Sequence, residues 1–153
     1  MPKEVIEDLF SQFIDAEDCP QILKRFKRLV KAVHVHAENP RDFYSELKSK
    51  LQSWKCKTLW DLLDARANQS EYGKGKISEE LQVLVIGAGP IGLRTAIEIA
   101  LLGGQVVVVE KRTSFTRNNV LHLWPFLLTD FRSLGAKRYY GKFCSGTIEH
   151  ISK

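Results

Sequence analysis

A glycine-rich turn between two apolar runs constrains the fold of this 153-residue chain more than any other feature. The first run, residues 81–86, leads into three glycines within six residues, and a segment with helical spacing follows. A second apolar run, residues 105–109, ends at the carboxylate of Glu110. The three glycines are Gly87, Gly89 and Gly92. This order of strand, glycine turn, helix, strand and terminal acid is the pattern of a dinucleotide-binding βαβ unit.

The residue types in this turn each have a physical reason. Gly87 lets the chain turn sharply off the first strand, and Gly89 has no side chain that would keep a pyrophosphate away from the backbone amides. Pro90 falls at the first helical position, where its fixed φ suits the helix. Gly92 allows the helix to pack closely on the strand, and Gly103 is placed to end the helix. The helix N-terminus then offers unpaired N–H groups and partial positive charge to an anion.

The acid after the second run narrows the choice of dinucleotide. Glu110 comes about twenty residues after the glycines, where a carboxylate can accept hydrogen bonds from both ribose hydroxyls of an adenosine. The same charge repels a 2′-phosphate, so NADP is disfavoured in this unit, although Lys111 and Arg112 soften the repulsion. From the residues alone, FAD and NAD both remain open.

Three stretches carry a specific signature: Gly87-Ala-Gly-Pro-Ile-Gly-Leu93, the run ending Glu110-Lys-Arg, and Arg117-Asn-Asn-Val-Leu-His-Leu-Trp-Pro-Phe126. Together they resemble the amino-terminal part of the MICAL proteins, which are FAD-dependent monooxygenases of the aromatic hydroxylase fold. The likeness extends over about residues 43–152. It implies an enzyme that uses NADPH and oxygen to oxidise methionines of actin to sulfoxides and so disassembles filaments. It also implies a cytoplasmic, cytoskeleton-associated protein with F-actin as a partner.

The resemblance also implies which residues contact FAD, on the glycine loop, on the acid and its two basic neighbours, and on the Arg-Asn-Asn stretch. With the residues of the turn itself, the candidate cofactor-binding set is Gly87, Gly89, Pro90, Ile91, Gly92, Glu110, Lys111, Arg112, Arg117, Asn118 and Asn119. Position 91 is commonly Cys in the family, and Ile there should preserve binding because the loop binds mainly through its backbone. From the residues alone, Arg117 is equally an exposed side chain beside an Asn that caps the next helix. No catalytic residue is identified.

The remaining sequence predicts an α/β fold in two parts, an N-terminal helical segment over residues 1–76 and a Rossmann-like FAD-binding unit over residues 77–153. Apolar faces at helical spacing predict helices over about residues 6–14, 22–33, 40–54 and 54–66. Another helix is expected near residues 123–134, closed by Gly135, with Trp124 and Pro125 anchoring its loop in the core. The helical segment is expected to pack on the βαβ unit.

The length is too short for a complete aromatic hydroxylase, which needs a second cofactor motif, a substrate sheet and further parallel strands. We therefore expect an incomplete hydroxylase fold, a truncated chain that by itself is marginally folded and catalytically inactive. Two parallel strands would leave one strand edge and one sheet face uncovered. Two other readings stay open, a non-catalytic isoform that binds a partner protein and a fragment of an NAD-binding dehydrogenase.

The charge and the composition limit which kinds of partner the chain can bind. The net charge is +5, and one predicted helix carries the crowded cations Lys24, Arg25, Lys27, Arg28 and Lys31. The simplest interpretation of these cations is a solvent-exposed helix face. The more specific interpretation is an electrostatic binding surface for an acidic protein such as actin. Nucleic acid is disfavoured because no aromatic stacking platform accompanies the charge. Three widely spaced cysteines suit a reducing cytosol, no apolar run predicts membrane insertion, and no spacing predicts a metal site.

Overall fold

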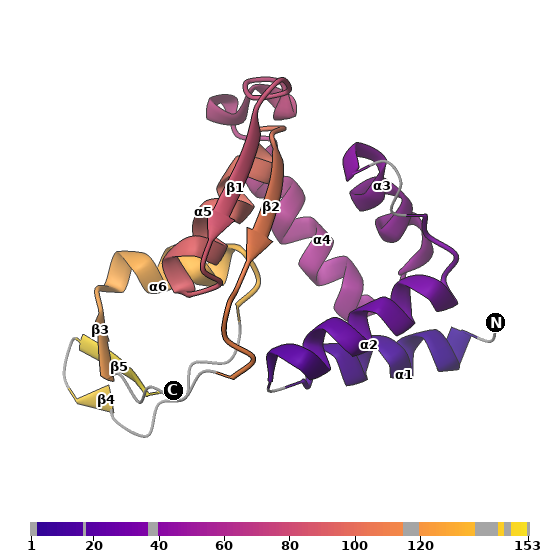
Figure 1. The fold of residues 1–153 in the computed structure, drawn as a ribbon, viewed down its shortest axis with the longest axis horizontal. Coiled ribbons are helices and arrows are strands. Elements are labelled where there is room, and N and C mark those ends of the chain that lie inside the picture. Colours follow the sequence, from indigo (N-terminus) through magenta and orange to yellow (C-terminus); the bar gives the residue numbers. More distant parts are fainter. Residues whose placement is uncertain are drawn as a thin grey trace.

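The described part of the chain is built mainly of helices, with one small parallel sheet and one small antiparallel sheet (Figure 1). A computed structural model describes residues 3–16, 18–36, 40–114, 120–136, 144–145 and 148–152. The helices are α1 (Lys3–Ile14), α2 (Cys19–Ala32), α3 (Pro40–Lys50), α4 (Trp54–Ala67), α5 (Pro90–Leu101) and α6 (Pro125–Ser133), with a 3-10 helix η1 (Ser70–Gly75). The strands are β1 (Gln82–Ile86), β2 (Gln105–Val109), β3 (Val120–Leu123), β4 (Cys144–Ser145) and β5 (Ile148–Ser152). The α/β class expected from the sequence is confirmed.

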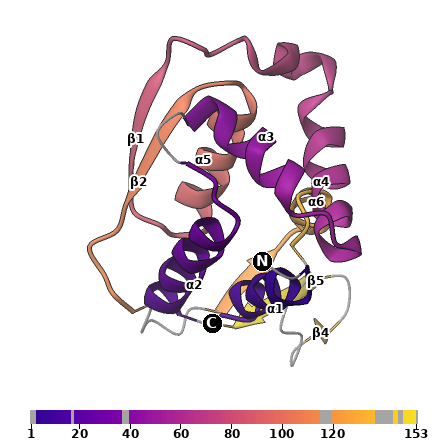
Figure 2. The ribbon, with the colours of Figure 1, turned by 90° about the vertical axis from the view of Figure 1, so that its right-hand side faces the viewer.

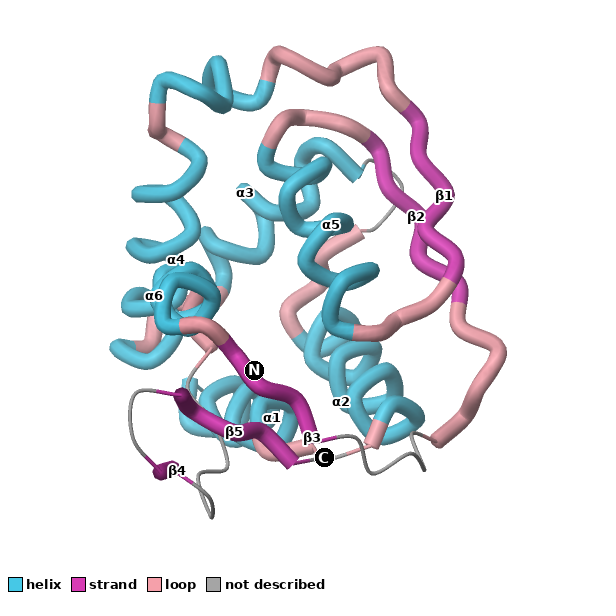
Figure 3. Tube along the Cα trace, turned by 90° about the vertical axis from the view of Figure 1, so that its left-hand side faces the viewer, coloured by secondary structure: helices cyan, strands magenta, loops and turns pink. Residues whose placement is uncertain are grey.

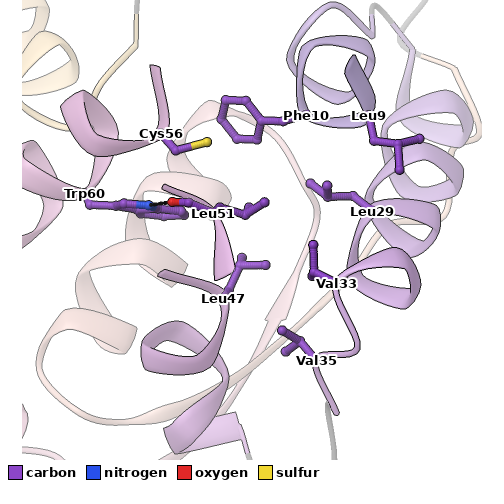
Figure 4. Packing of buried hydrophobic residues seen from close by; sticks show 9 residues of the cluster. All are labelled: Leu9, Phe10, Leu29, Val33, Val35, Leu47, Leu51, Cys56 and Trp60. Carbon is purple, nitrogen blue, oxygen red and sulfur yellow. Dashed lines mark hydrogen bonds between the residues drawn. The ribbon is translucent and has the colours of Figure 1, made fainter. Parts of the chain in front are cut away.

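The core of the helical segment lies between α1, α2 and the stretch from α3 into α4. Leu29 of α2 is fully buried there, and Leu51 and Cys56 are nearly so (Figure 4). The indole of Trp60, in the middle of α4, donates a hydrogen bond of 2.8 Å to the carbonyl oxygen of Leu51 at the turn between α3 and α4, which satisfies the buried donor. The apolar faces predicted over residues 6–13 and 26–33 therefore make this core, while Ile14 and Ile22, expected on the same faces, are exposed.

One detail of the sequence prediction is wrong at this turn. The apolar spacing places Trp54 on the third helix and also at the start of the fourth. Only the second position is correct, because α3 ends at Lys50 and Trp54 opens α4, where it is largely exposed. The side chain of Ser53 accepts a hydrogen bond from the backbone N–H of Cys56, so the new helix starts with its own cap. The apolar spacing of residues 43–54 did not reveal that the chain turns between two helices.

Strands β1 and β2 pair in parallel and are joined by α5, the crossover that the sequence predicts (Figure 3). Helix α5 contacts both strands and covers one sheet face. The opposite face carries Leu84 paired with Val107 and Ile86 paired with Val109, all exposed, with 83% of the Ile86 surface open to solvent. Parallel strands are normally covered on both faces, so this face is the incomplete one that the sequence led us to expect.

The second sheet was not predicted. Its strand order is β3-β5-β4, and both pairings are antiparallel. Helix α6 follows β3 directly and lies against α4 (Figure 2). Its end at Gly135 agrees with the sequence, since the N–H of Ala136 bonds back to the carbonyl of Phe131 at 3.0 Å.

A cluster of charged side chains joins the helical segment to the βαβ unit. Arg66 of α4 donates to the hydroxyl of Tyr72 at 2.6 Å and to Asp130 of α6 at 2.8 Å, and Tyr72 in turn donates to Glu98 of α5 at 2.6 Å. Arg94 of α5 donates to Asp130 at 2.6 Å and also contacts Glu98. These five residues are called the polar cluster below. The polar cluster packs the helical segment against the βαβ unit. The boundary between two domains at residues 76 and 77 therefore stays a prediction.

Helix α2 ends at a residue with left-handed backbone, and this gives a stability prediction. His34 has φ 54°, its N–H bonds to the carbonyl of Lys31 at 3.3 Å, and the N–H of Val35 bonds to the carbonyl of Val30 at 3.2 Å. This is the Schellman arrangement, in which glycine is preferred. We expect His34→Gly to raise the free energy of unfolding by about 1 kcal/mol in urea denaturation. His36→Gly is the control, and an equal gain there would contradict the backbone explanation.

Candidate functional site

The glycine turn between β1 and α5 is held by a close approach of backbone to backbone. Gly87 has φ +107°, and its N–H continues the strand ladder by donating to the carbonyl of Val109 at 2.7 Å. A Cβ added at Gly92 would lie 2.1 Å from the carbonyl oxygen of Gly87, so the first turn of α5 packs directly on the turn that precedes it. The close packing predicted for Gly92 is confirmed, and any side chain there would displace the turn.

The outer side of this turn is open. Gly89 is the residue before α5 and Pro90 is the first residue within it, as the sequence predicts, and no side chain caps this end. A Cβ built at Gly87 or Gly89 would meet no atom within 4 Å. The helix N-terminus therefore presents uncapped N–H groups and partial positive charge to free space, which is the environment that an anionic diphosphate requires.

The carboxylate of Glu110, at the end of β2, points toward this turn. One oxygen accepts a hydrogen bond from the backbone N–H of Ala88 at 2.9 Å, and the other accepts from the backbone N–H of Arg112 at 2.8 Å. The Arg112 guanidinium adds contacts of 3.0 and 3.2 Å to the two oxygens. The guanidinium and then the two backbone N–H groups lower the pKa of Glu110 to about 2. Glu110 is thus an ionised acceptor beside the glycine turn at any ordinary pH.

The other candidate residues are placed as follows. Ile91 is exposed on the first turn of α5, and Lys111 is exposed just beyond Glu110. Arg117, Asn118 and Asn119 lie outside the described residues. The structure thus brings the glycine turn, the start of α5 and the segment 110–112 together at the carboxyl ends of the two strands, where open α/β sheets bind ligands.

The anchoring role expected for Trp124 is wrong. Trp124 is 64% exposed and stands immediately before α6, where it makes no side-chain cap. Leu128 is the buried residue of that helix. Pro125 is the first residue of α6, so the Trp-Pro pair starts the helix on the surface.

Sequence reasoning missed the polar cluster behind the site. Only the Arg94 and Glu98 pair, four residues apart on α5, carried a local signal. Arg66 lies 64 residues from Asp130 and 32 from Glu98, and no sequence pattern links them. Among the described residues there is no group of three side chains that could hold a metal ion, and no helix with the length and apolar character to cross a bilayer.

Comparison with known proteins agrees with this geometry. The FAD binding domain family matches residues 80–120, which span β1, α5, β2 and the segment after them. The F-actin monooxygenase mical1 of Danio rerio is 54% identical over 144 residues, 94% of this chain. The F-actin monooxygenase MICAL3 of Homo sapiens and the protein-methionine sulfoxide oxidase mical3a of Danio rerio show the same identity over the same share. Over these residues the chain is homologous to the MICAL monooxygenases.

The resemblance read from the sequence is therefore confirmed, and the family match supports FAD as the dinucleotide. The chain spans 12% of the length of the zebrafish mical1 protein and 7% of human MICAL3. Those much longer proteins are named for F-actin and for methionine sulfoxide.

Proposed function

We propose that this chain supplies the site for the adenosine diphosphate half of FAD in a flavin-dependent monooxygenase. The observation that carries the proposal is the Glu110 carboxylate, ionised and directed at the N–H of Ala88 in the glycine turn. A diphosphate would lie against the open turn at Gly89 and the N-terminus of α5, and the adenosine ribose would lie at Glu110. These residues fit that half of the cofactor by charge, by hydrogen bonding and by free space.

Arg112 has a part in this arrangement. Its guanidinium occupies both oxygens of Glu110, which together with two backbone N–H groups leaves little acceptor capacity. A ribose diol would replace the guanidinium on the carboxylate and leave Arg112 to meet the cofactor phosphates. Arg112 thus keeps the Glu110 carboxylate ionised before the cofactor binds and neutralises phosphate charge after it has bound.

The reaction that we propose for the complete protein is oxidation of F-actin methionines to sulfoxides. Bound FAD would supply the oxygen chemistry, with NADPH giving two electrons, one oxygen atom entering the methionine sulfur and the other leaving as water. The relatives' names support the F-actin substrate and the sulfoxide product. Glu110 repels a 2′-phosphate, so NADPH would bind elsewhere than this βαβ unit. Inactivity of this chain by itself stays a prediction.

A titration of the chain with FAD tests the proposal. We expect flavin absorbance to co-purify with the protein or flavin fluorescence to change on binding, and we expect ADP to compete because it fills the same half-site. Glu110→Gln should weaken FAD binding about tenfold or more, because a charge-assisted acceptor for the ribose hydroxyls is lost. The matched control is Glu80→Gln, which removes the same charge from an exposed position before β1.

The outcomes separate the candidate functions. Equal affinity of the Glu110 and Glu80 variants would contradict the assignment of the ribose site. Stabilisation by NAD but not by FAD would favour a dehydrogenase fragment. A folded, colourless protein that binds F-actin but no dinucleotide would favour a non-catalytic binding module.

A further inference from the structure

The net charge of the molecule is concentrated on helix α2. The chain has 23 Lys and Arg residues against 18 Asp and Glu residues, a net charge of +5. Helix α2 holds five of these cations and no acid, so the rest of the chain is balanced with 18 of each sign. A charge distribution of this kind creates a local positive potential without making the whole protein strongly basic.

Four of the five cations share one exposed face. At about 100° per residue, Lys24, Lys27, Arg28 and Lys31 fall within an arc of roughly 100° on α2, and all four are exposed. They are called the basic face below. The opposite side of α2 is fixed in the core, where Leu29 is fully buried and the ring of Phe26 packs 5.1 Å from that of Phe13. The helix cannot turn these cations inward without breaking the core.

The basic face has no internal neutralisation among the described residues. Arg25, the fifth cation, donates to the carbonyl oxygen of Gln12 at 2.6 Å and to the side chain of Gln21 at 3.0 Å. The four cations of the basic face form no ion pair with a described carboxylate, whereas Lys48 pairs with Asp64 elsewhere in the same segment. Like charges three and four residues apart on a helix repel one another. An acidic surface laid on α2 would remove that repulsion.

We infer that the basic face of α2 is a docking surface for an acidic protein surface, which, resting on the proposed function, is that of F-actin. Lipid fits less well, because the apolar side of α2 is buried in the core and the side chain of Leu23 is the largest apolar surface exposed beside the cations. Single-stranded nucleic acid fits less well, because the basic face carries no aromatic ring on which a base could stack.

The position of the basic face agrees with such a role. In all three views the start of α2 lies beside the loop that follows β2, the loop that carries Glu110 and Arg112 (Figures 1, 2 and 3). A partner held along α2 would therefore lie at the end of the molecule where the cofactor site is proposed. Docking through α2 would bring the substrate protein to the flavin enzyme without using the dinucleotide site itself.

The test is co-sedimentation of the full chain with F-actin at about 50 mM and about 300 mM salt. The variant Lys24→Gln/Lys27→Gln/Arg28→Gln/Lys31→Gln removes the basic face. The control Lys55→Gln/Lys57→Gln/Lys74→Gln/Lys76→Gln removes the same charge from exposed positions elsewhere. We expect the first to bind about tenfold more weakly than wild type at the lower salt, the control to stay within about twofold, and the difference to vanish at the higher salt.

Several results would overturn the inference. They are equal losses in both variants, which would show an effect of net charge alone, no loss in either, or no sedimentation of the wild-type chain. Binding to phosphatidylserine vesicles or single-stranded RNA that depends on the basic face, without binding to F-actin, would assign the surface to another partner. The double variant Lys27→Gln/Lys31→Gln should give an intermediate loss, and FAD titration of every variant tests the cofactor proposal separately.

Discussion

Replacement of Gly92 by alanine should abolish FAD binding and lower the free energy of unfolding by about 2 kcal/mol or more. The added Cβ would lie 2.1 Å from the Gly87 carbonyl oxygen and 3.3 Å from a methyl carbon of Val85. The first contact is with backbone, which cannot rotate away, so either α5 moves off the sheet or the glycine turn changes shape. Either movement separates the uncapped helix N-terminus from Glu110. Flavin titration and urea unfolding measure the two effects.

Gly89→Ala is the matched control for this prediction. It makes the same chemical change three residues earlier, where the new Cβ meets no atom within 4 Å and the backbone φ is −74°. Stability should therefore change by less than about 1 kcal/mol, while FAD binding weakens because the methyl group occupies space beside the proposed diphosphate. If both variants lost stability equally, the close approach at Gly92 would not be its cause. If Gly89→Ala bound FAD normally, the diphosphate would not lie against the turn.

Removal of the Arg94 cation should be the second large effect. Arg94→Met is expected to lower the free energy of unfolding by about 2 to 3 kcal/mol at pH 7, because it takes away one of the two cations that face the partly buried carboxylates of Asp130 and Glu98 and leaves them Arg66 alone. Arg94 and Asp130 each keep 22% of their side-chain surface exposed, so solvent screens the pair only in part. Hydrogen bonding from Arg94 is the largest cause that lowers the pKa of Asp130. Urea unfolding of both proteins measures the difference.

The same cluster sets the sign of a pH dependence. The pKa of Glu98 is also lowered, with burial opposing and hydrogen bonds from Tyr72 and Arg94 prevailing. Carboxyl groups whose pKa is lower in the folded state stabilise it above their unfolded pKa near 4, and this stability is lost as pH falls through the folded pKa. The wild type should therefore lose more stability than Arg94→Met between about pH 6 and pH 3. Parallel losses in the two proteins would show that Arg94 is not the cause, and Arg94→Lys should fall between them because lysine lacks the planar fork.

What the sequence could predict depended on how local each feature is. The turn at Gly87, the close packing of Gly92 and the end of α5 at Gly103 follow from residue types within one strand, turn and helix, and all were placed correctly. The position of Glu110 beside the glycine turn follows for the same reason, because two adjacent parallel strands bring their carboxyl ends together. The cofactor contacts themselves stay predictions.

The features that the sequence did not predict depend on tertiary packing. The polar cluster forms because helices from distant parts of the chain pack together, and no spacing in the sequence predicts these contacts. The sequence predicts a core position for Trp124 from its large aromatic side chain and a place on the third helix for Trp54 from the apolar spacing, yet each stands at the start of a helix on the surface. The antiparallel sheet was missed because β3 is only four residues long and its partner, β5, begins 25 residues after β3 ends.

The uncovered face of the β1 and β2 pair has a practical consequence for the chain when it is made on its own. That face is a strip of aliphatic side chains exposed to water, formed by Leu84, Ile86, Val107 and Val109. An exposed strip of this kind binds other apolar surfaces. During synthesis that means holdase chaperones, and after purification it means hydrophobic dyes, vessel walls and other copies of the same polypeptide. The amount of soluble protein will depend on how quickly another apolar surface binds this strip.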